Sequence, residues 1–477
     1  METALNTPST RIPPLRPEDE RLSVSAYVLY GFQHVLTMYG GIIAVPLIVG
    51  QAAGLPPAEI GILIASCLFM GGLATLVQTL GIPFFGCRLP LVQGVSFASV
   101  ATILAILSSG GDLPSVFGAV MMAALIGLLI TPVFSKIIRF FPPLVTGSVI
   151  TTIGLSLMPV AAHWAMGGNA KAADFGSTAN IGLAAATLAI VLLLSKLGNA
   201  AISRLSILLA MVLGTIIAWA AGMTDFSRVA DGPLLAAPTL FHFGLPEFHP
   251  AAILSMFIVI LVVLVETSAD ILAVGDIIGT PIDSRRLGDG LRADMVSSLI
   301  APVFGSFTQS AFAQNVGLVA VTGIKSRFVV AASGIILLVL GLLPVMGRLI
   351  ATVPAAVLGG AGLVLFGTVA ASGIRTLAKV DYQDNMNLII VATSVGFGMI
   401  PIAAPQFYSQ FPAWVATIFH SGISSAAIMA IVLNLLFNHL KRGTPDKPSV
   451  FAAGTAHAPG DTAPRSASQG PAESLAH

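Results

Sequence analysis

The chain has 477 residues, of which 56% are hydrophobic and only 9% charged, and its formal net charge at pH 7 is +1. Soluble domains carry about 25% charged residues, so this composition excludes a soluble domain and indicates a polytopic protein of the lipid bilayer. The near-neutral charge argues against nucleic acid as a partner. Cys67 and Cys87 match neither a metal-binding spacing nor a disulfide framework, so no metal is expected.

Residues 1–24 are polar and proline-bearing without an apolar core, so we expect a cytoplasmic tail rather than a cleavable signal peptide. The rest contains fourteen apolar windows long enough for a straight or a broken spanning helix. The third, ninth and tenth windows are short or interrupted. The predicted spans are 25–50, 59–80, 89–107, 116–134, 143–161, 180–195, 205–222, 250–272, 292–306, 310–323, 328–346, 354–373, 386–403 and 415–438.

The basic residues test this count independently. If both termini are cytoplasmic, 19 of the 22 Lys and Arg residues fall inside, and only Lys171, Arg228 and Arg348 fall outside. The positive-inside rule expects such a split, and a miscount by one span would scramble it. Residues 223–249 then form an external loop, and residues 439–477 form a disordered cytoplasmic tail rich in Ala, Gly, Pro and Ser.

Faint internal echoes suggest two halves of seven spans each. The run from Pro142 to Gly147 in span five has the proline-to-glycine spacing of the run from Pro354 to Gly359 in span twelve. The interrupted third span likewise stands seven before the interrupted tenth. Because seven is odd, the halves would have opposite membrane orientation. Broken spans in corresponding positions point to a binding site near the bilayer midplane.

The most informative segment runs from Asp294 to Arg327, because it places one acid and the amide pair Gln314 and Asn315 in an apolar, glycine-punctuated stretch. Broken backbone with polar side chains is tolerated at membrane depth only where it lines a cavity inside the protein. The segment is therefore a binding-site candidate.

Ionisable side chains inside the predicted spans are few, and each costs roughly 2.5–3.5 kcal/mol at the bilayer centre. They are His34 in span one, Glu266 and Asp270 in span eight, and Asp294 at the start of span nine. Glu266 and Asp270 share one helix face and would repel if both were ionised, which favours proton uptake. A structural carboxylate bonded to a neighbouring helix is the alternative. His34 fits either a bridge between two helices or a contact with ligand.

The run from Gln314 to Gly323, QNVGLVAVTG, resembles the signature of the nucleobase-ascorbate transporter family, also called nucleobase:cation symporter-2. Gln33 and His34 are similar to that family's Gln-His motif in span one. The acidic residues of spans eight and nine match the family's acidic positions as well. The resemblance covers nearly the whole membrane region, and the sequence around the signature resembles the bacterial uric acid and xanthine branch.

The resemblance implies an all-α polytopic fold of fourteen spans in two inverted seven-span repeats, with short β-strands in the broken spans three and ten. It implies a core (transport) domain over 25–135 and 250–346 and a gate domain over 136–222 and 347–438. It also implies a homodimer in the inner membrane of a bacterial cell, with the proton as coupling ion and no cofactor.

The family's site residues carry over by position. The implied substrate-binding residues are Glu266, Gln314, Phe97, Phe312, Ser96 and Ala313. The residues implied in proton coupling and site support are Glu266, Asp294, Asn315, His34 and Asp270. Helix packing is the alternative role of the two phenylalanines.

The expected function is proton-coupled import of an oxidised purine, uric acid and/or xanthine. The carboxamide of Gln314 can both donate and accept hydrogen bonds, as the edge of an oxidised purine requires, whereas glutamate there would suit uracil. Ser96 and Ala313 would set the room for the C8 oxygen of urate.

Three other functions would need different features in the sequence. A uracil:proton symporter remains an alternative, as does an anion transporter of the same inverted-repeat architecture, although Glu266 argues against the second. A membrane enzyme is not expected, because the chain contains neither a Gly-x-x-x-x-Gly-Lys phosphate loop nor a His-Glu-x-x-His pattern.

Overall fold

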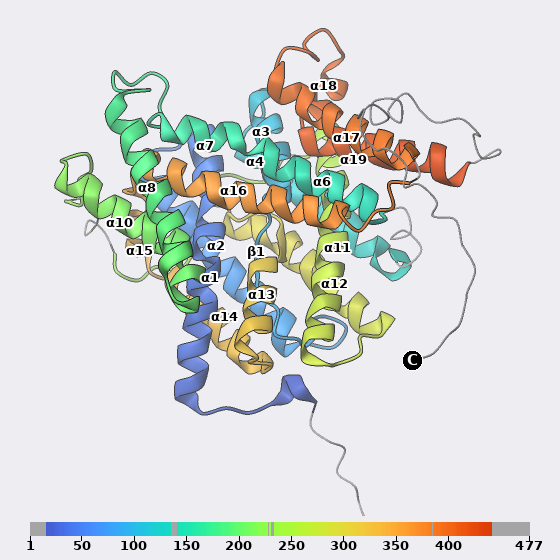
Figure 1. Cartoon of the computed structure of the whole chain (residues 1–477), viewed down its shortest axis with the longest axis horizontal. Helices are drawn as coiled ribbons and strands as arrows, with labels where there is room; N and C mark the ends of the chain where they lie inside the picture. The colour runs from blue at the N-terminus through green and yellow to red at the C-terminus, as the bar shows by residue number, and fades with distance from the viewer. Residues whose placement is uncertain (1–15, 135–140, 228, 230–232, 384, 441–477) are drawn as a thin grey trace, which may run out of the picture.

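The computed structural model describes residues 16–134, 141–227, 229, 233–383 and 385–440. Regular structure in these ranges is helical apart from two short strands (Figure 1). The predicted disordered tail lies almost entirely outside the described residues, since it continues from 441 to 477, and so do residues 1–15 of the predicted N-terminal tail.

The elements alternate long helices with short, broken ones. The first half contains α1 (Val24–Ala52), α2 (Pro57–Leu80), β1 (Gln93–Val95), α3 (Val100–Ser108), α4 (Leu113–Ile130), α6 (Pro143–Ser156), α7 (Met158–Ala165), α8 (Thr178–Leu197), α9 (Ala200–Arg204) and α10 (Ser206–Ala220). The second half contains α11 (Pro250–Ile278), α12 (Ser284–Ile300), β2 (Gln309–Ala311), α13 (Ala313–Thr322), α14 (Arg327–Gly341), α15 (Pro344–Ala351), α16 (Ala355–Leu377), α17 (Asn385–Ala403), α18 (Ala413–Phe419) and α19 (Gly422–Asn434).

Eight helices in the described ranges are long and apolar enough to cross a membrane, or nine spans if the bent pair α14 and α15 counts as one. Shorter apolar helices cover Phe97–Ser108, Ser206–Ala220 and Gly422–Asn438. The windows of predicted spans nine and ten fall on α12, and on β2 with α13, which are too short or too polar to cross a membrane as straight apolar helices. The chain is a multi-pass membrane protein, and the number of fourteen spans stays a prediction.

Several elements differ from the predicted windows, and two of these differences have a clear local cause. The sequence predicts one span over 328–346, but the chain bends by 78° between α14 and α15. Pro344 begins α15, and proline has no N–H with which to continue the preceding helix. α12 begins at Ser284, well before the predicted 292, because Asp283 caps it by accepting a hydrogen bond from the Arg286 N–H at 2.7 Å.

The helices pack in two groups, each of which combines both halves of the chain. In the first group α2 packs against α14, α1 against both, and α4 against α11 and α12. In the second group α16 packs against α6, α7 and α8, while α17 and α19 pack against α6. Figure 1 shows α16 and α6 side by side across the view, whereas α1 runs steeply to them. The predicted division into a core domain and a gate domain that move relative to each other stays a prediction.

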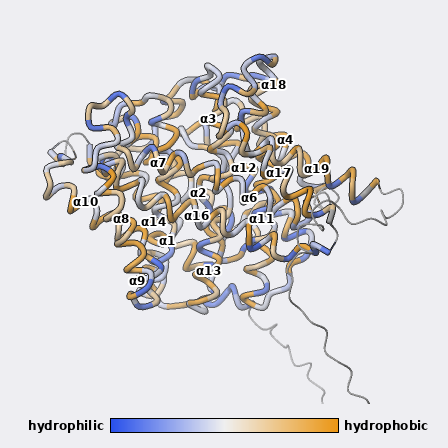
Figure 2. The backbone as a smooth tube through the Cα atoms, turned by 45° about the horizontal axis from the view of Figure 1, so that its top comes forward, coloured by the Kyte–Doolittle hydropathy of each residue, from blue (hydrophilic) through white to orange (hydrophobic). Residues whose placement is uncertain are grey.

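The helices pack closely and expose apolar side chains, as expected for a protein embedded in a membrane. A Cβ atom on Gly72 of α2 would lie 2.6 Å from the carbonyl oxygen of Gly334 in α14, so only glycine allows this approach. Leu192 of α8 and Trp219 of α10 are 56% and 61% exposed, as expected for side chains that contact lipid. Figure 2 shows hydrophobic residues along most of the helices.

Candidate functional site

The two strands meet in the interior of the molecule. β1 and β2 pair antiparallel, with Gly94 opposite Ser310. Two further backbone hydrogen bonds extend the pairing, from Ser96 N–H to the Thr308 carbonyl at 2.8 Å and from Phe312 N–H to the Val92 carbonyl at 3.1 Å. The pairing therefore brings the broken segments of the two halves together, which places the predicted residues 96–97 and 312–315 at its two ends.

Side-chain hydroxyl groups accept hydrogen bonds from backbone N–H groups on the outer edges of this two-stranded sheet. An edge strand inside a protein needs partners for its backbone groups. The Thr75 hydroxyl of α2 accepts from Gln93 N–H at 2.9 Å, and the Ser298 hydroxyl of α12 accepts from Gln309 N–H at 2.9 Å. The arrangement is the same in both halves, because each hydroxyl lies on the helix that precedes its strand. The sequence analysis did not identify these residues; a hydroxyl one helix before each broken span is the signal that could have found them.

A cavity of ≈ 380 Å³ lies beside the start of α13. It is lined by residues of α1, α9, α10, α13 and α16, and Phe312, Gln314 and Arg204 are among them. The volume falls in the range of about 300–1,000 Å³ that small-molecule sites occupy. Gln314 and its neighbour Ala313 are both exposed. The amide of Gln314 is therefore open to a molecule in this cavity.

The rings of Phe97 and Phe312 converge on one point of α1. A Cβ atom on Gly41 would lie 2.8 Å from Phe312 and 3.5 Å from Phe97. Phe97 also packs edge-on against Phe366 of α16, with ring centroids 6.0 Å apart. Ser96 caps the short 3-10 helix Phe97–Ser99, because its hydroxyl accepts from Ala98 N–H at 3.2 Å. The phenylalanines thus form an apolar wall between α1 and α16.

Asn315 and His34 join α13 to α1. The side chains are 1% and 2% exposed, and Nδ2 of Asn315 donates to Nδ1 and to the carbonyl oxygen of His34, both at 3.0 Å. An amide nitrogen can only donate, so Nδ1 of His34 accepts and carries no proton. This geometry is the helix bridge that was one of the two alternatives for His34.

Asp294 lies in the middle of α12 and is 1% exposed. Its Oδ2 accepts from the Thr267 hydroxyl of α11 at 2.5 Å, and its Oδ1 accepts from Nε2 of Gln78 in α2 at 3.2 Å. Both partners are neutral. Neither Gln78 nor Thr267 was predicted from the sequence, since a lone amide or hydroxyl in an apolar helix does not reveal which distant residue it contacts.

Glu266 and Asp270 lie one turn apart on α11 and are both half-buried. Glu266 directly precedes Thr267, whose hydroxyl approaches Ala311 N–H of β2 at 3.4 Å. Among the described residues no hydrogen bond joins Glu266 to Gln314, or either acid to another side chain. The structure therefore places Glu266 on a helix that packs against β2 and α13, without a hydrogen bond to the predicted amide among the described residues.

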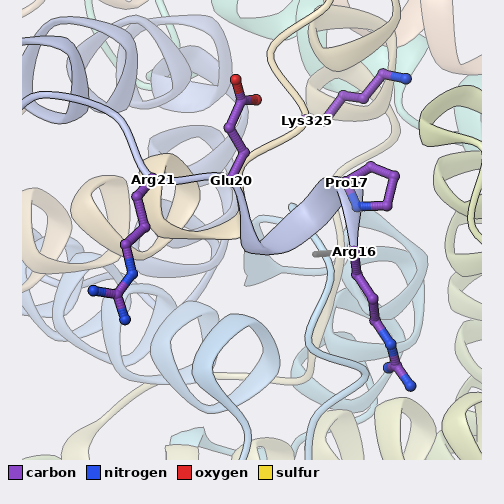
Figure 3. A pocket seen from close by; sticks show the side chains of 5 residues that line it. All are labelled: Arg16, Pro17, Glu20, Arg21 and Lys325. Carbon is purple, nitrogen blue, oxygen red and sulfur yellow. The ribbon is translucent and has the colours of Figure 1, made fainter. Parts of the chain in front are cut away.

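A second, larger cavity of ≈ 660 Å³ lies elsewhere, beside the N-terminal strap, by which we mean residues 16–21. Figure 3 shows that Arg16 and Arg21 point away from each other, while Glu20 and Lys325 lie on the other side of the strap. None of the predicted site residues lines this cavity. We therefore assign the candidate site to the smaller cavity.

Two ion pairs fasten the strap to helix ends. Glu18, 1% exposed, accepts from Nη2 of Arg286 at 2.7 Å and from the Thr280 hydroxyl at 2.7 Å. Asp19 pairs with Arg327 at the start of α14, also at 2.7 Å. In the described part of the chain, no group of three or more His, Cys, Asp or Glu side chains is placed to hold a metal ion.

Comparisons with known proteins agree with the family resemblance. Residues 25–407 match the model of a family described as a permease family. The chain is 42% identical over 429 residues to the uric acid transporter UacT of Escherichia coli, covering 89% of each protein. It is 40% identical to the xanthine permease of Bacillus subtilis, over 86% of this chain and 93% of that protein. The uric acid permease PucK of Bacillus subtilis is 39% identical, over 88% and 97%.

Solved structures show a similar fold at low sequence identity. The transmembrane domain of the cyanobacterial bicarbonate transporter BicA is 17% identical, with a TM-score of 0.58 over 84% of this chain and 96% of that one. The murine Solute Carrier 26 family member A9 anion transporter, in its inward-facing state, is 13% identical, with a TM-score of 0.59 over 87% and 69%. These likenesses concern the fold alone.

Proposed function

Because the chain belongs to the nucleobase-ascorbate transporter family of permeases, we propose that it is a proton-coupled symporter that imports uric acid and/or xanthine across the bacterial inner membrane. Its relatives are permeases rather than enzymes, and the names of the three relatives reported above include uric acid or xanthine. The observation that carries the coupling is Asp294, a buried acid with only neutral hydrogen-bond donors, on the helix that also fastens β2.

The purine would bind at the paired strand ends. Gln314 would hydrogen-bond the base from the start of α13, and the Phe97 and Phe312 rings would flank it. Glu266 would supply a second polar contact from α11, which requires the base to bridge the distance between the two side chains. Ser96 and Ala313 would set the room for the C8 oxygen of urate.

Proton binding would accompany base binding. An ionised carboxylate is costly inside a membrane protein, so protonation of Glu266 or Asp294 would favour the loaded site, with Asp270 beside Glu266 adding repulsion. His34 and Asn315 would keep α1 and α13 together. The core would then move against the gate, and the differential affinity of the two states for the protonated, loaded site would drive that shift.

The remaining architecture belongs to the same proposal. We place both termini in the cytoplasm, fourteen spans in two inverted seven-span repeats, and short strands in broken spans three and ten. The protein would work as a homodimer without a cofactor.

Two alternative substrates make different demands on the site. Uracil would favour a glutamate where this chain has Gln314. The fold is shared with a bicarbonate transporter and an anion transporter. Sequence identities of 17% and 13% are too low to infer a shared substrate. Uptake assays can separate all three classes.

The test is uptake of labelled xanthine and uric acid in cells that lack their own purine carriers, with and without a protonophore. Protonophore-sensitive accumulation of either purine, with no competition by excess uracil or bicarbonate, is the expected result. Accumulation that survives the protonophore would overturn the coupling. A correctly inserted protein that takes up neither purine would overturn the substrate class.

A further inference from the structure

The two neutral partners of Asp294 differ in their freedom to turn. Nε2 of Gln78 donates to Asp294 and also to the Gly290 carbonyl, both at 3.2 Å, while its Oε1 accepts from Cys87 N–H at 3.1 Å. Turning this amide over would place its oxygen against two acceptors and its nitrogen against a donor. Gln78 is therefore a fixed donor whatever the protonation state of Asp294.

Thr267 is fully buried, and its hydroxyl can change roles. It now donates to Oδ2 of Asp294 at 2.5 Å, and its oxygen also lies 3.4 Å from Ala311 N–H. A hydroxyl oxygen has two lone pairs and one proton. If Asp294 binds a proton at Oδ2, the new O–H can donate to the Thr267 oxygen. The hydroxyl proton then turns to the carbonyl of Val263, one turn earlier on α11, as threonines in helices commonly do.

The side-chain amide of Gln93 also lies near Asp294, and its hydrogen bonds are not fixed. The side-chain amide of Gln93 in β1 approaches Asp294, yet neither its oxygen nor its nitrogen has a hydrogen-bond partner among the described residues. Gln93 is 1% exposed. An unpaired buried amide is costly, so this group can gain a partner when the hydrogen bonds of Asp294 rearrange.

We propose that Thr267 is a positioning residue that transmits the protonation state of Asp294 to strand β2, and so to the purine site at the strand's end. The proposal rests on the proton coupling proposed above. When Asp294 is ionised, Thr267 donates to the carboxylate. When Asp294 is protonated, Thr267 accepts from it, and the oxygen becomes a weaker acceptor for Ala311 N–H, because it now shares its lone pairs between two donors. Only hydrogen bonds change, and the proton that enters stays on Asp294.

The groups around Asp294 are few. Asp270 faces it from α11, with Glu266 one turn before, and Cys87 lies near it before β1. α12 also packs against α2, which contributes Gln78, and against α4, β2 and the 3-10 helices Thr131–Val133 and Ala301–Phe304, which contain no ionisable residue. The charged groups of α12 nearest to Asp294 in the sequence are in ion pairs, Arg286 with Glu18 of the strap and Arg292 with Asp289. A change in pH dependence at this site can therefore be traced to Asp294, Asp270 or Glu266.

Thr267→Val removes the hydroxyl at nearly constant shape, and Thr267→Ser restores it. Thr215→Val is the matched control, because the buried Thr215 hydroxyl donates to the Met211 carbonyl of its own helix and has no other hydrogen-bond partner in the described part of the chain. Each protein is reconstituted in liposomes and assayed with the labelled purine that the wild type accumulates. Counterflow at equal pH measures binding and movement without net proton flux, and accumulation under an imposed pH gradient measures coupling.

We expect Thr267→Val to keep counterflow within about threefold of the wild type but to lose gradient-driven accumulation, with the apparent affinity no longer changing by up to about tenfold per pH unit. Thr267→Ser and Thr215→Val should accumulate purine normally. The proposal is overturned if Thr267→Val accumulates as the wild type does, or if Thr267→Ser folds and loses accumulation. If the wild type itself exchanges purine but ignores the pH gradient, the proton coupling of the proposed function fails instead.

Discussion

Two carboxylates in this protein are equally buried and differ in one partner. Glu18 of the N-terminal strap and Asp294 of α12 are each 1% exposed. Each accepts a hydrogen bond from a threonine hydroxyl, at 2.7 Å from Thr280 and at 2.5 Å from Thr267. The second donor is the guanidinium of Arg286 for Glu18 and the amide of Gln78 for Asp294.

The charge of that second donor decides what the acid can do. Burial alone would raise the pKa of Glu18, but hydrogen bonds from Thr280 and Arg286 and the charge of Arg286 outweigh it and hold that pKa below its usual value. Glu18 thus stays ionised and serves as an anchor. Protonating it would leave Arg286 without its counter-charge, whereas protonating Asp294 leaves no charge unpaired. The comparison indicates a structural role for Glu18, and it is consistent with the proton exchange that we propose for Asp294.

The largest effect should follow from making Asp294 unable to bind a proton. Asp294→Asn keeps a side chain of the same size, and we expect gradient-driven purine accumulation to fall to the level of cells without the carrier. Purine binding should weaken by no more than about tenfold, or 1.4 kcal/mol, because Asp294 does not line the cavity. Uptake and equilibrium binding on the same preparation check this. Accumulation near the wild-type level would remove Asp294 from the mechanism.

Replacing the neutral donor Gln78 by a cation should make Asp294 behave like the ion-paired Glu18. We expect Gln78→Lys to reduce gradient-driven accumulation by about tenfold or more, since a neighbouring positive charge favours the ionised carboxylate. Gln78→Leu is the control, because it removes the donor without adding charge and should retain more transport. Equal losses in the two variants would show that the amide matters for packing rather than for its neutrality.

Breaking the anchor should affect stability more than transport. Glu18→Gln leaves Arg286 with a neutral partner, and we expect a loss of about 3 kcal/mol in the free energy of unfolding, as for other broken buried pairs. Glu20→Gln, two residues away on the exposed side of the strap, is the matched control and should change little. Thermal unfolding in detergent measures both. A normal melting temperature for Glu18→Gln, or a loss of coupling without a loss of stability, would contradict the assignment.

The sequence predicted the parts of this molecule that depend on local patterns. The family was predicted from the run beginning at Gln314, and the comparisons confirm it. The apolar windows correspond to the long helices because hydropathy measures what a lipid-facing helix requires. Pro344 was a visible signal for the bend after α14 that the window count overlooked. The early start of α12 could not be read from hydropathy, because its first turns are polar.

The partners of Asp294 could not be predicted in the same way. Gln78 and Thr267 are separated from it by 216 and 27 residues, and only the packing of α2, α11 and α12 brings the three side chains together. A pattern along one helix says which face is polar but not which distant group meets that face. For the same reason the sequence suggested Glu266, Asp270 and Asp294 as candidate proton carriers without showing that the hydrogen-bond donors to Asp294 are neutral.

The smallest expected effect is the pH dependence of the anchor, and its sign follows from the lowered pKa of Glu18. An acid whose pKa is lower in the folded state stabilises the protein above the pKa of the unfolded chain and loses that contribution as pH falls through the folded value. The stability difference between the wild type and Glu18→Gln should be constant from about pH 8 to pH 6 and shrink below about pH 4.5, the usual range for a glutamate. Melting temperatures of both proteins across this range measure the difference. A difference that varies between pH 6 and 8 would mean that a neutral-range group sets the strength of the strap, and the contrast between the two acids would no longer hold.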